Sequence, residues 1–124
     1  MYFQKDWLMR QIEDMCRIIV KILFGKDYKK YEIVDETHLS ETDLWYTQLM
    51  ALTAQKRLCE AEDLLFDSID PANPSHMAIA LDFYQTINTL SDEELENADF
   101  SREEIRDGLK QLTVLRGLNI DAVL

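Results

Sequence analysis

Apolar side chains recur along this chain at the spacing of an α-helix, and this periodicity restricts it to helical folds. In the first segment, expected to be helical over about residues 5–24, a helix would gather the apolar positions into one stripe. Gly25 follows and is well placed to end the helix in a left-handed turn. Only three glycines and two prolines occur in 124 residues, which disfavours a turn-rich β fold. The stripe consists of Leu8, Ile12, Met15, Ile19, Ile22 and Leu23.

The middle of the chain shows where further helices begin. Ser40, with Asp43 three residues later, predicts a capped helix start. Residues 41–69 contain neither glycine nor proline. They could form one long helix or two helices joined by a tight turn near residues 54–56. We favour two, because one helix of that length is rare in a small domain.

The second half of the sequence contains clearer signals for the starts and ends of helices. Asn73 can cap a helix whose first position is Pro74, and this helix is expected to run to about Leu90. Two complete capping boxes follow, and Gly117 is expected to end the last helix. The sequence therefore predicts an all-α antiparallel helical bundle of about five to six helices, folded as a single domain over residues 1–124. The capping boxes are Ser91 with Glu94 and Ser101 with Glu104.

The charge of the chain limits its partners. The net charge is −11, with −2 on residues 1–62 and −9 on residues 63–124. Such a field repels nucleic acid and anionic lipid, so we expect neither as a partner. One basic segment, residues 26–32, interleaves Tyr28 and Tyr31 with lysines and could bind a phosphate or single-stranded nucleic acid. Given the overall acidity, we interpret it as an ordinary surface loop.

No motif for catalysis or metal binding is apparent. His38 and His76 are far apart, and no Glu-x-x-His pattern or glycine-rich phosphate loop occurs. Cys16 and Cys59 lie within expected helices beside apolar positions, so both are predicted to be buried, reduced thiols in a cytoplasmic protein. We therefore expect no catalytic residue, no cofactor and no metal, and a protein that is not an enzyme.

Residues 58–65, followed by Asp70 and Pro71, resemble the second half of a tetratricopeptide repeat. In that family a small residue, here Ala61, lets two antiparallel helices approach closely, and Trp45 falls on the position of the large aromatic. Leu49 departs from the family pattern, which has a small residue there. A weaker second unit begins around Ile79 and Phe83, 34 residues later than the first. The resemblance implies tetratricopeptide-like helix hairpins over about residues 41–116.

The same resemblance implies a partner-binding face on the first helix of each unit. The positions that would form it are Tyr46, Met50, Tyr84 and Asn88. Aromatic and methionine side chains suit adaptable contacts with a peptide. The alternative is that Tyr46, Met50 and Tyr84 belong to the core. The most favoured function is a protein–protein interaction or scaffolding module; the alternative is a small-ligand-binding protein or an enzyme.

The first helix is also a candidate for self-association. Its apolar arc is broader than one neighbour needs, which could serve a two-fold homodimer. The residues proposed for this contact are Trp7, Ile12, Ile19 and Phe24.

The whole chain further resembles a family of small uncharacterised helical proteins of Gram-positive bacteria. The similarity lies in residues 3–12, 22–25 and 61–66. This resemblance implies a helical fold and a cytoplasmic location, and it assigns no activity.

Overall fold

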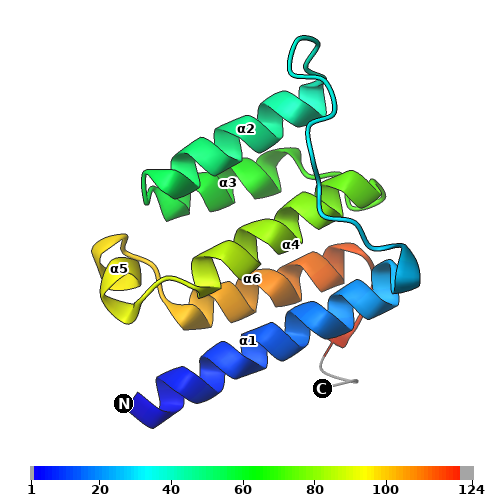
Figure 1. Cartoon of the computed structure of the whole chain (residues 1–124). Coiled ribbons are helices and arrows are strands. Elements are labelled where there is room, and N and C mark those ends of the chain that lie inside the picture. Colours follow the sequence, from blue (N-terminus) through cyan, green and yellow to red (C-terminus); the bar gives the residue numbers. More distant parts are fainter. Residues whose placement is uncertain (1, 121–124) are drawn as a thin grey trace.

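The computed structural model describes the backbone of residues 2–120 and the side chains of residues 6–120. Within residues 2–120 there are six α-helices, one 3-10 turn and no strand, which confirms the predicted all-α class. Residues 121–124 of the predicted single domain lie outside the described part. The elements are α1 (Tyr2–Leu23), η1 (Gly25–Asp27), α2 (Glu41–Ala54), α3 (Leu58–Ser68), α4 (Pro74–Asn88), α5 (Asp92–Asn97) and α6 (Arg102–Leu115), as Figure 1 shows.

Side-chain caps fix the starts of four helices, as the sequence predicted. The Ser40 hydroxyl accepts the Asp43 N–H at 3.1 Å, and the Asp43 carboxylate accepts the Ser40 N–H at 3.0 Å. Equivalent capping boxes start α5 at Ser91 and α6 at Ser101. The Asn73 side chain caps α4, with proline at its first turn. These bonds satisfy backbone donors that a helix start otherwise leaves unpaired.

The predicted break in residues 41–69 is confirmed. Helix α2 ends at Ala54 and α3 begins at Leu58, with Lys56 between them in the left-handed region at φ 61°. Gly25, at φ 59°, ends α1 as expected. Ile22 of the predicted apolar stripe is instead 47% exposed, in the last turn of α1.

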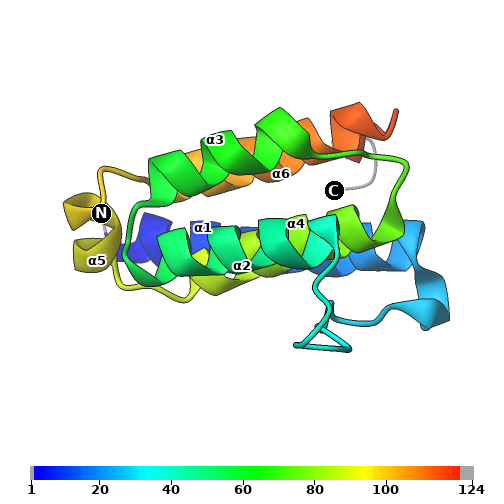
Figure 2. The same cartoon turned by 90° about the horizontal axis from the view of Figure 1, so that it is seen from above.

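The helices stack in two layers. Figure 2 shows α3 and α6 in one layer and α1, α2 and α4 in the other. Helix α4 contacts α1, α2 and α6, while α2 packs on α3, and α1 also packs on α6. In Figure 1, α1 and α6 run in the same direction and α4 runs opposite to both. The first helix of the chain thus closes the core against the two longest helices of the second half.

Helix α4 is the centre of this arrangement. Ten of its fifteen residues are buried, including Ile79, Phe83 and Ile87 on one side and Met77 and Tyr84 on another. A helix buried around most of its circumference needs neighbours on several sides. Helices α1, α2 and α6 provide them.

At Gly108, the backbone of α6 comes close to the side chain of Tyr84 in α4. A Cβ built at Gly108 would lie 2.1 Å from the Tyr84 hydroxyl oxygen and 2.4 Å from its Cζ. The Tyr84 ring is completely buried, and its hydroxyl donates to the Glu62 carboxylate of α3 at 2.5 Å. The missing side chain at Gly108 therefore lets one tyrosine reach from α4 past α6 to α3.

We predict that Gly108→Ala destabilises the protein, although alanine is the better helix former. Overpacking at the Tyr84 ring should outweigh the propensity gain and give a net loss of about 1–2 kcal/mol. Urea denaturation followed by circular dichroism measures this loss. In a Tyr84→Phe background, where the nearest clashing atom is absent, the loss should be smaller. Equal losses in both backgrounds would contradict the assignment.

Glu62 offers a test of the same contact by pH. Burial raises the pKa of the Glu62 carboxyl above its ordinary value of 4.5, the Tyr84 hydrogen bond opposes this shift, and the Glu104 and Asp63 carboxylates add to it. Because the folded pKa lies above the unfolded one, the contribution of Glu62 to stability is fully present below the unfolded pKa. It is lost as the pH rises through the folded pKa.

As the pH rises through the folded pKa of Glu62, the Glu62→Gln variant should therefore lose less stability than the wild type. Glutamine cannot ionise, and its carbonyl oxygen still accepts the Tyr84 hydroxyl. Urea denaturation of both proteins between acidic and neutral pH gives the comparison, in which the other carboxyl groups cancel. Parallel stability curves would show that Glu62 ionises equally in both states.

Candidate interaction site

The structure separates the four residues of the predicted partner-binding face. Tyr84 is completely buried, and Asn88 is almost so. Asn88 instead connects α4 to α1 in the interior, because its amide donates to the Met9 carbonyl of α1 at 3.2 Å. Tyr84 therefore lies in the core, the alternative left open for it, and Asn88 is buried as well, because α4 is enclosed by its neighbours.

Tyr46 and Met50 are half-buried on α2 and pack against the core. The segment between η1 and α2, residues 28–40 (the strap), lies beside Tyr46. The Tyr31 ring stands 5.0 Å from the Tyr46 ring, and the Tyr31 hydroxyl donates to the Asp43 carboxylate. Lys30 of the strap pairs with buried Asp82 of α4 at 3.2 Å. The strap therefore occupies part of the surface predicted to receive a partner.

The residues proposed for self-association are likewise divided. Ile12 and Ile19 are completely buried in the core, so they cannot contact a second copy. Phe24 is half-buried and packs edge-on against Tyr28, with ring centroids 5.2 Å apart. Trp7 alone of the four projects into solvent, with 62% of its surface exposed.

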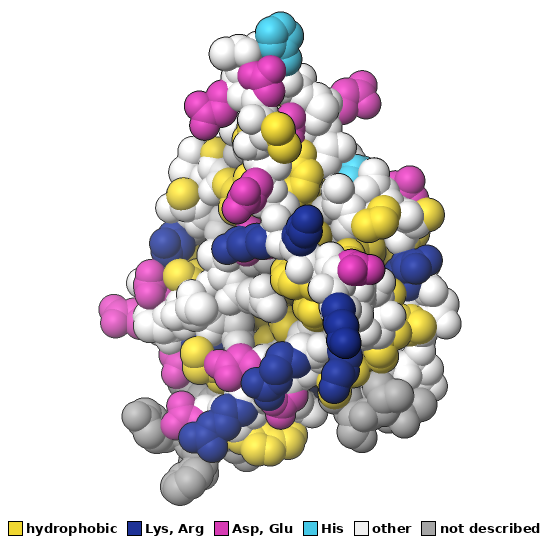
Figure 3. Space-filling model, turned by 45° about the vertical axis from the view of Figure 1, so that its right-hand side comes forward, with side chains coloured by type: hydrophobic (Ala, Val, Ile, Leu, Met, Phe, Trp, Pro, Cys, Tyr) yellow, Lys and Arg dark blue, Asp and Glu magenta, His cyan; other side chains and the backbone are white. Residues whose placement is uncertain are grey.

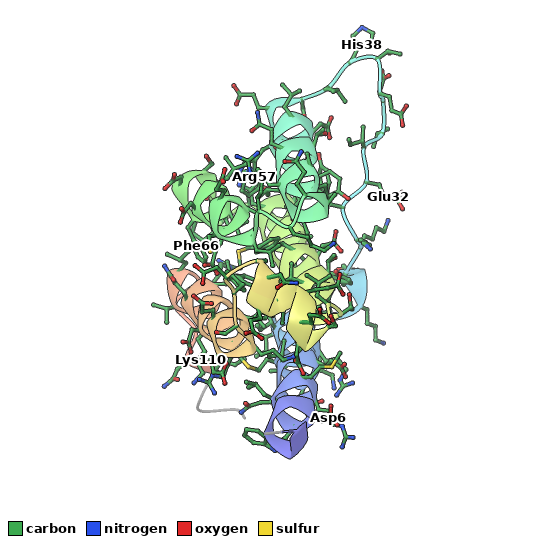
Figure 4. The ribbon with its side chains drawn as sticks, turned by 90° about the vertical axis from the view of Figure 1, so that its left-hand side faces the viewer. Asp6, Glu32, His38, Arg57, Phe66 and Lys110 are labelled. Carbon is green, nitrogen blue, oxygen red and sulfur yellow. The ribbon has the colours of Figure 1, made fainter. Side chains whose placement is uncertain are left out.

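A surface pocket lies beside Trp7, at the end of the molecule where α1 starts and α5 crosses. Its volume is about 720 Å³. Figure 4 looks onto this end, with α5 in front, α6 and Lys110 to the left and the strap with His38 above. Helix α1 contributes Trp7 and Leu8, α3 contributes Cys59, and α5, α6 and the turn between them supply the rest. These are Asp92, Leu95, Glu96, Asp99, Phe100, Ser101, Arg102, Glu103, Glu104 and Arg106.

Buried Arg102 ties the elements of this pocket together. Its guanidinium donates to the Asn88 carbonyl at 2.8 Å, the Asn88 side-chain oxygen at 3.0 Å and the Leu90 carbonyl at 2.6 Å. It also pairs with Asp92 at 3.2 Å. The end of α4 thereby receives the donors that its last carbonyls lack, and α5 is held to the start of α6. The positive charge of Arg102 is therefore compensated by groups of the protein itself.

The rim of the pocket is negatively charged. Glu96, Asp99, Glu103 and Glu104 are exposed there. Partial burial raises the pKa of the Cys59 thiol, and the carboxylates of Glu104 and Asp99 raise it further, which records the negative field. A pocket with apolar walls, an exposed indole and a carboxylate rim suits a cationic side chain. We call these four carboxylates the acidic rim.

The pocket was not expected from the sequence. Helix starts favour negative charge, which accounts for the acidic residues 92–96 within their own helix. Helices α5 and α6 both start at this end of the molecule, so their acidic first turns face one pocket. The available signal was the pair of capping boxes ten residues apart in the more acidic half of the chain.

Neither cysteine has the surroundings of a nucleophile. Cys16 of α1 is buried, and burial raises the pKa of its thiol to about 12. Cys59 is exposed, not buried as predicted, because its side of α3 faces the pocket. Both are free thiols, and raised thiol pKa values keep them protonated near neutral pH.

The two histidines lie at separate places. His38 sits in the strap beside Asp35 at 3.2 Å, and His76 packs its ring 4.6 Å from the Trp45 ring. In the part of the chain that the structure describes, no three His, Cys, Asp or Glu side chains gather closely enough to hold a metal ion. Among the same residues, no helix combines the length and apolarity needed to cross a bilayer.

Comparison with family models identifies relatives of this chain. A model described as a family of unknown function, DUF6483, matches residues 2–117. The chain belongs to the DUF6483 family. No curated protein and no solved structure matches the chain. The match covers every helix described above, so the pocket and the strap both lie within the DUF6483 region.

We predict that Arg102→Met destabilises the protein by about 2–4 kcal/mol, because it leaves the Asn88 and Leu90 carbonyls without their donor. Thermal and urea denaturation measure this loss. The matched control is Arg106→Met, which removes a neighbouring arginine that pairs with Asp107 near the surface at 3.5 Å. The control should change stability by less than about 1 kcal/mol. Similar effects for both variants would contradict a special role for Arg102.

Proposed function

We propose that this DUF6483 protein is a cytoplasmic protein–protein interaction module without catalytic activity, and that its acidic rim binds a basic segment of a partner. The observation that carries the proposal is the pocket beside Trp7. It combines an exposed aromatic ring with carboxylates whose nearest buried cation, Arg102, is already bound to carbonyl groups.

The chemistry of the pocket favours a lysine or arginine side chain on an extended or helical peptide. The Trp7 ring face can hold a cation, and Leu8, Leu95 and Phe100 in the walls can receive the aliphatic part of the same residue. Exposed charge pairs each contribute little, so several carboxylates around one cavity are needed for useful affinity.

The tetratricopeptide resemblance belongs to this proposal as well. The α2–α3 and α4–α6 pairs each have one helix in each layer, which is compatible with two repeat-like hairpins, the second interrupted by the α5 insertion. In the proposal, the strap takes the surface beside Tyr46 and leaves the acidic end free for a partner. A cytoplasmic location follows from the reduced state expected for both cysteines.

A labelled basic peptide tests the proposal. We expect a Lys/Arg-rich peptide to bind, and a peptide of equal length with glutamates in place of the cations not to bind, by fluorescence anisotropy. Of the two tryptophans, Trp45 is buried and Trp7 is exposed, so binding should also change the tryptophan emission. Replacing Trp7 with alanine should abolish that change.

The rim variants define the site. Glu103→Gln with Glu104→Gln should weaken binding about two- to tenfold, from the loss of two exposed charge pairs. The control is Glu41→Gln with Glu60→Gln, which removes the same charge from α2 and α3 outside the pocket. Equal weakening by both pairs would indicate attraction to the net charge alone and would overturn the assignment of the pocket.

A further inference from the structure

The outer side of α1 carries apolar residues that the fold leaves exposed. At 100° per residue, positions 7, 11, 18 and 22 share one side of the helix, about 100° around it from the buried Ile12 and Ile19 and so on the flank of the buried stripe. Trp7 is 62% exposed and Ile22 47% exposed, and Ile18 between them is half-buried. We call Trp7, Ile18 and Ile22 the outer seam. These positions replace the buried ones in the predicted self-association face.

Charge is distributed unevenly along this seam. Residues 1–30 carry seven basic and four acidic side chains, a net +3, whereas residues 31–124 carry six basic and twenty acidic ones, a net −14. Arg10, Arg17, Lys21 and Lys26 are exposed on α1 and η1. Figure 3 shows Lys and Arg side chains from the middle of one face downward, with Asp and Glu side chains among them.

The two ends of α1 therefore differ in sign. The start of the helix, at Trp7, lies against the acidic rim. Near its end, Arg17 and Lys21 line a second surface pocket of about 780 Å³ together with Ile18, Val20, Tyr28 and Asp14, whose carboxylate pairs with Arg17. A helix of 22 residues spans about 33 Å, so the acidic rim and the lysines at positions 21 and 26 lie near opposite ends of α1.

We propose that a second copy of this chain covers the outer seam, with its α1 antiparallel to the first and related by a two-fold axis. An axis midway between Trp7 and Ile22 sets Trp7 of each copy against Ile22 of the other. The same operation brings Lys21 and Lys26 of each copy to the acidic rim of the other. Each favourable contact then occurs twice, as a closed two-fold interface requires.

The distribution of charge favours an antiparallel pair of α1 helices over a parallel pair. In a parallel pair the two acidic rims would meet, and like charges in contact oppose association. Two chains of −11 repel each other at most orientations, and seven of the thirteen basic side chains lie in residues 1–30. The inference goes beyond the proposed function, because it requires no other protein.

Sedimentation equilibrium on the full chain gives the first test. At high-micromolar concentration we expect a mass of twice the chain's 14.6 kDa. Ile22→Glu should return the mass to 14.6 kDa with unchanged helical content. Leu44→Glu is the matched control, because Leu44 is 50% exposed on α2, away from α1, and this variant should remain dimeric. A monomeric wild type, or a dimer that Ile22→Glu leaves intact, overturns the proposal.

Cross-linking tests the direction of the pair. In a Cys59→Ser background, a Trp7→Cys chain and an Ile22→Cys chain are mixed and treated with a short bis-maleimide. The mixture should give a covalent dimer of one chain of each kind, and either chain alone should give little. The two positions are fifteen residues, about 22 Å, apart along α1, so self-linked dimers of either chain would indicate a parallel pair and overturn the antiparallel one.

A charge exchange tests the role of the rim. Lys21→Glu with Lys26→Glu should weaken dimerisation at least tenfold, and adding Glu96→Lys with Glu103→Lys to the same chain should restore most of it. If the fourfold variant stays as weak as the double variant, the rim is not the complementary surface. Basic-peptide binding is measured separately with monomeric Ile22→Glu, so a failed dimer test leaves the proposed function intact, and the reverse also holds.

Discussion

Enclosure of α4 is the constraint on which the rest of the structure depends. Once the flanks of this helix are buried, residues that would face a partner in an open arrangement must satisfy interior requirements instead. Asn88 does so by bonding Met9 of α1 and Arg102 of α6. Tyr84 does so by reaching Glu62 past Gly108. The central helix therefore joins the layers by polar contacts as well as by apolar packing.

Helix ends were predictable from sequence because their causes are local. Ser40, Asn73, Ser91 and Ser101 each act within three residues of themselves, so the chain order contains the whole interaction. Apolar periodicity predicted the buried stripe of α1 for the same reason. The approach of Gly108 to Tyr84 depends on residues 24 positions apart, and no local pattern announces it.

The candidate site was harder to predict than the fold because it is assembled from four helices. Each acidic first turn has a complete local explanation in its own helix. What makes a site is that α5 and α6 start at the same end of the molecule, over Trp7 of α1 and Cys59 of α3. The partner-binding positions inferred from the repeat resemblance failed at Tyr84 and Asn88 for a related reason. Asn88 bonds to α1, which lies outside the region of that resemblance, and Tyr84 lies against Gly108 of α6 and bonds to Glu62 of α3.

Both proposals use the surface beside Trp7, so partner binding and dimerisation affect each other. In the proposed pair, Ile22 and two lysines of the second copy lie at the surface where a basic partner would bind. A single acidic rim cannot serve both at once, so dimerisation and partner binding compete, and each weakens the other by the same factor. Concentration of the chain would then set how much of the rim is free. In this scheme the chain without a partner is dimeric, and a basic partner of sufficient affinity shifts the equilibrium to the partner-bound monomer.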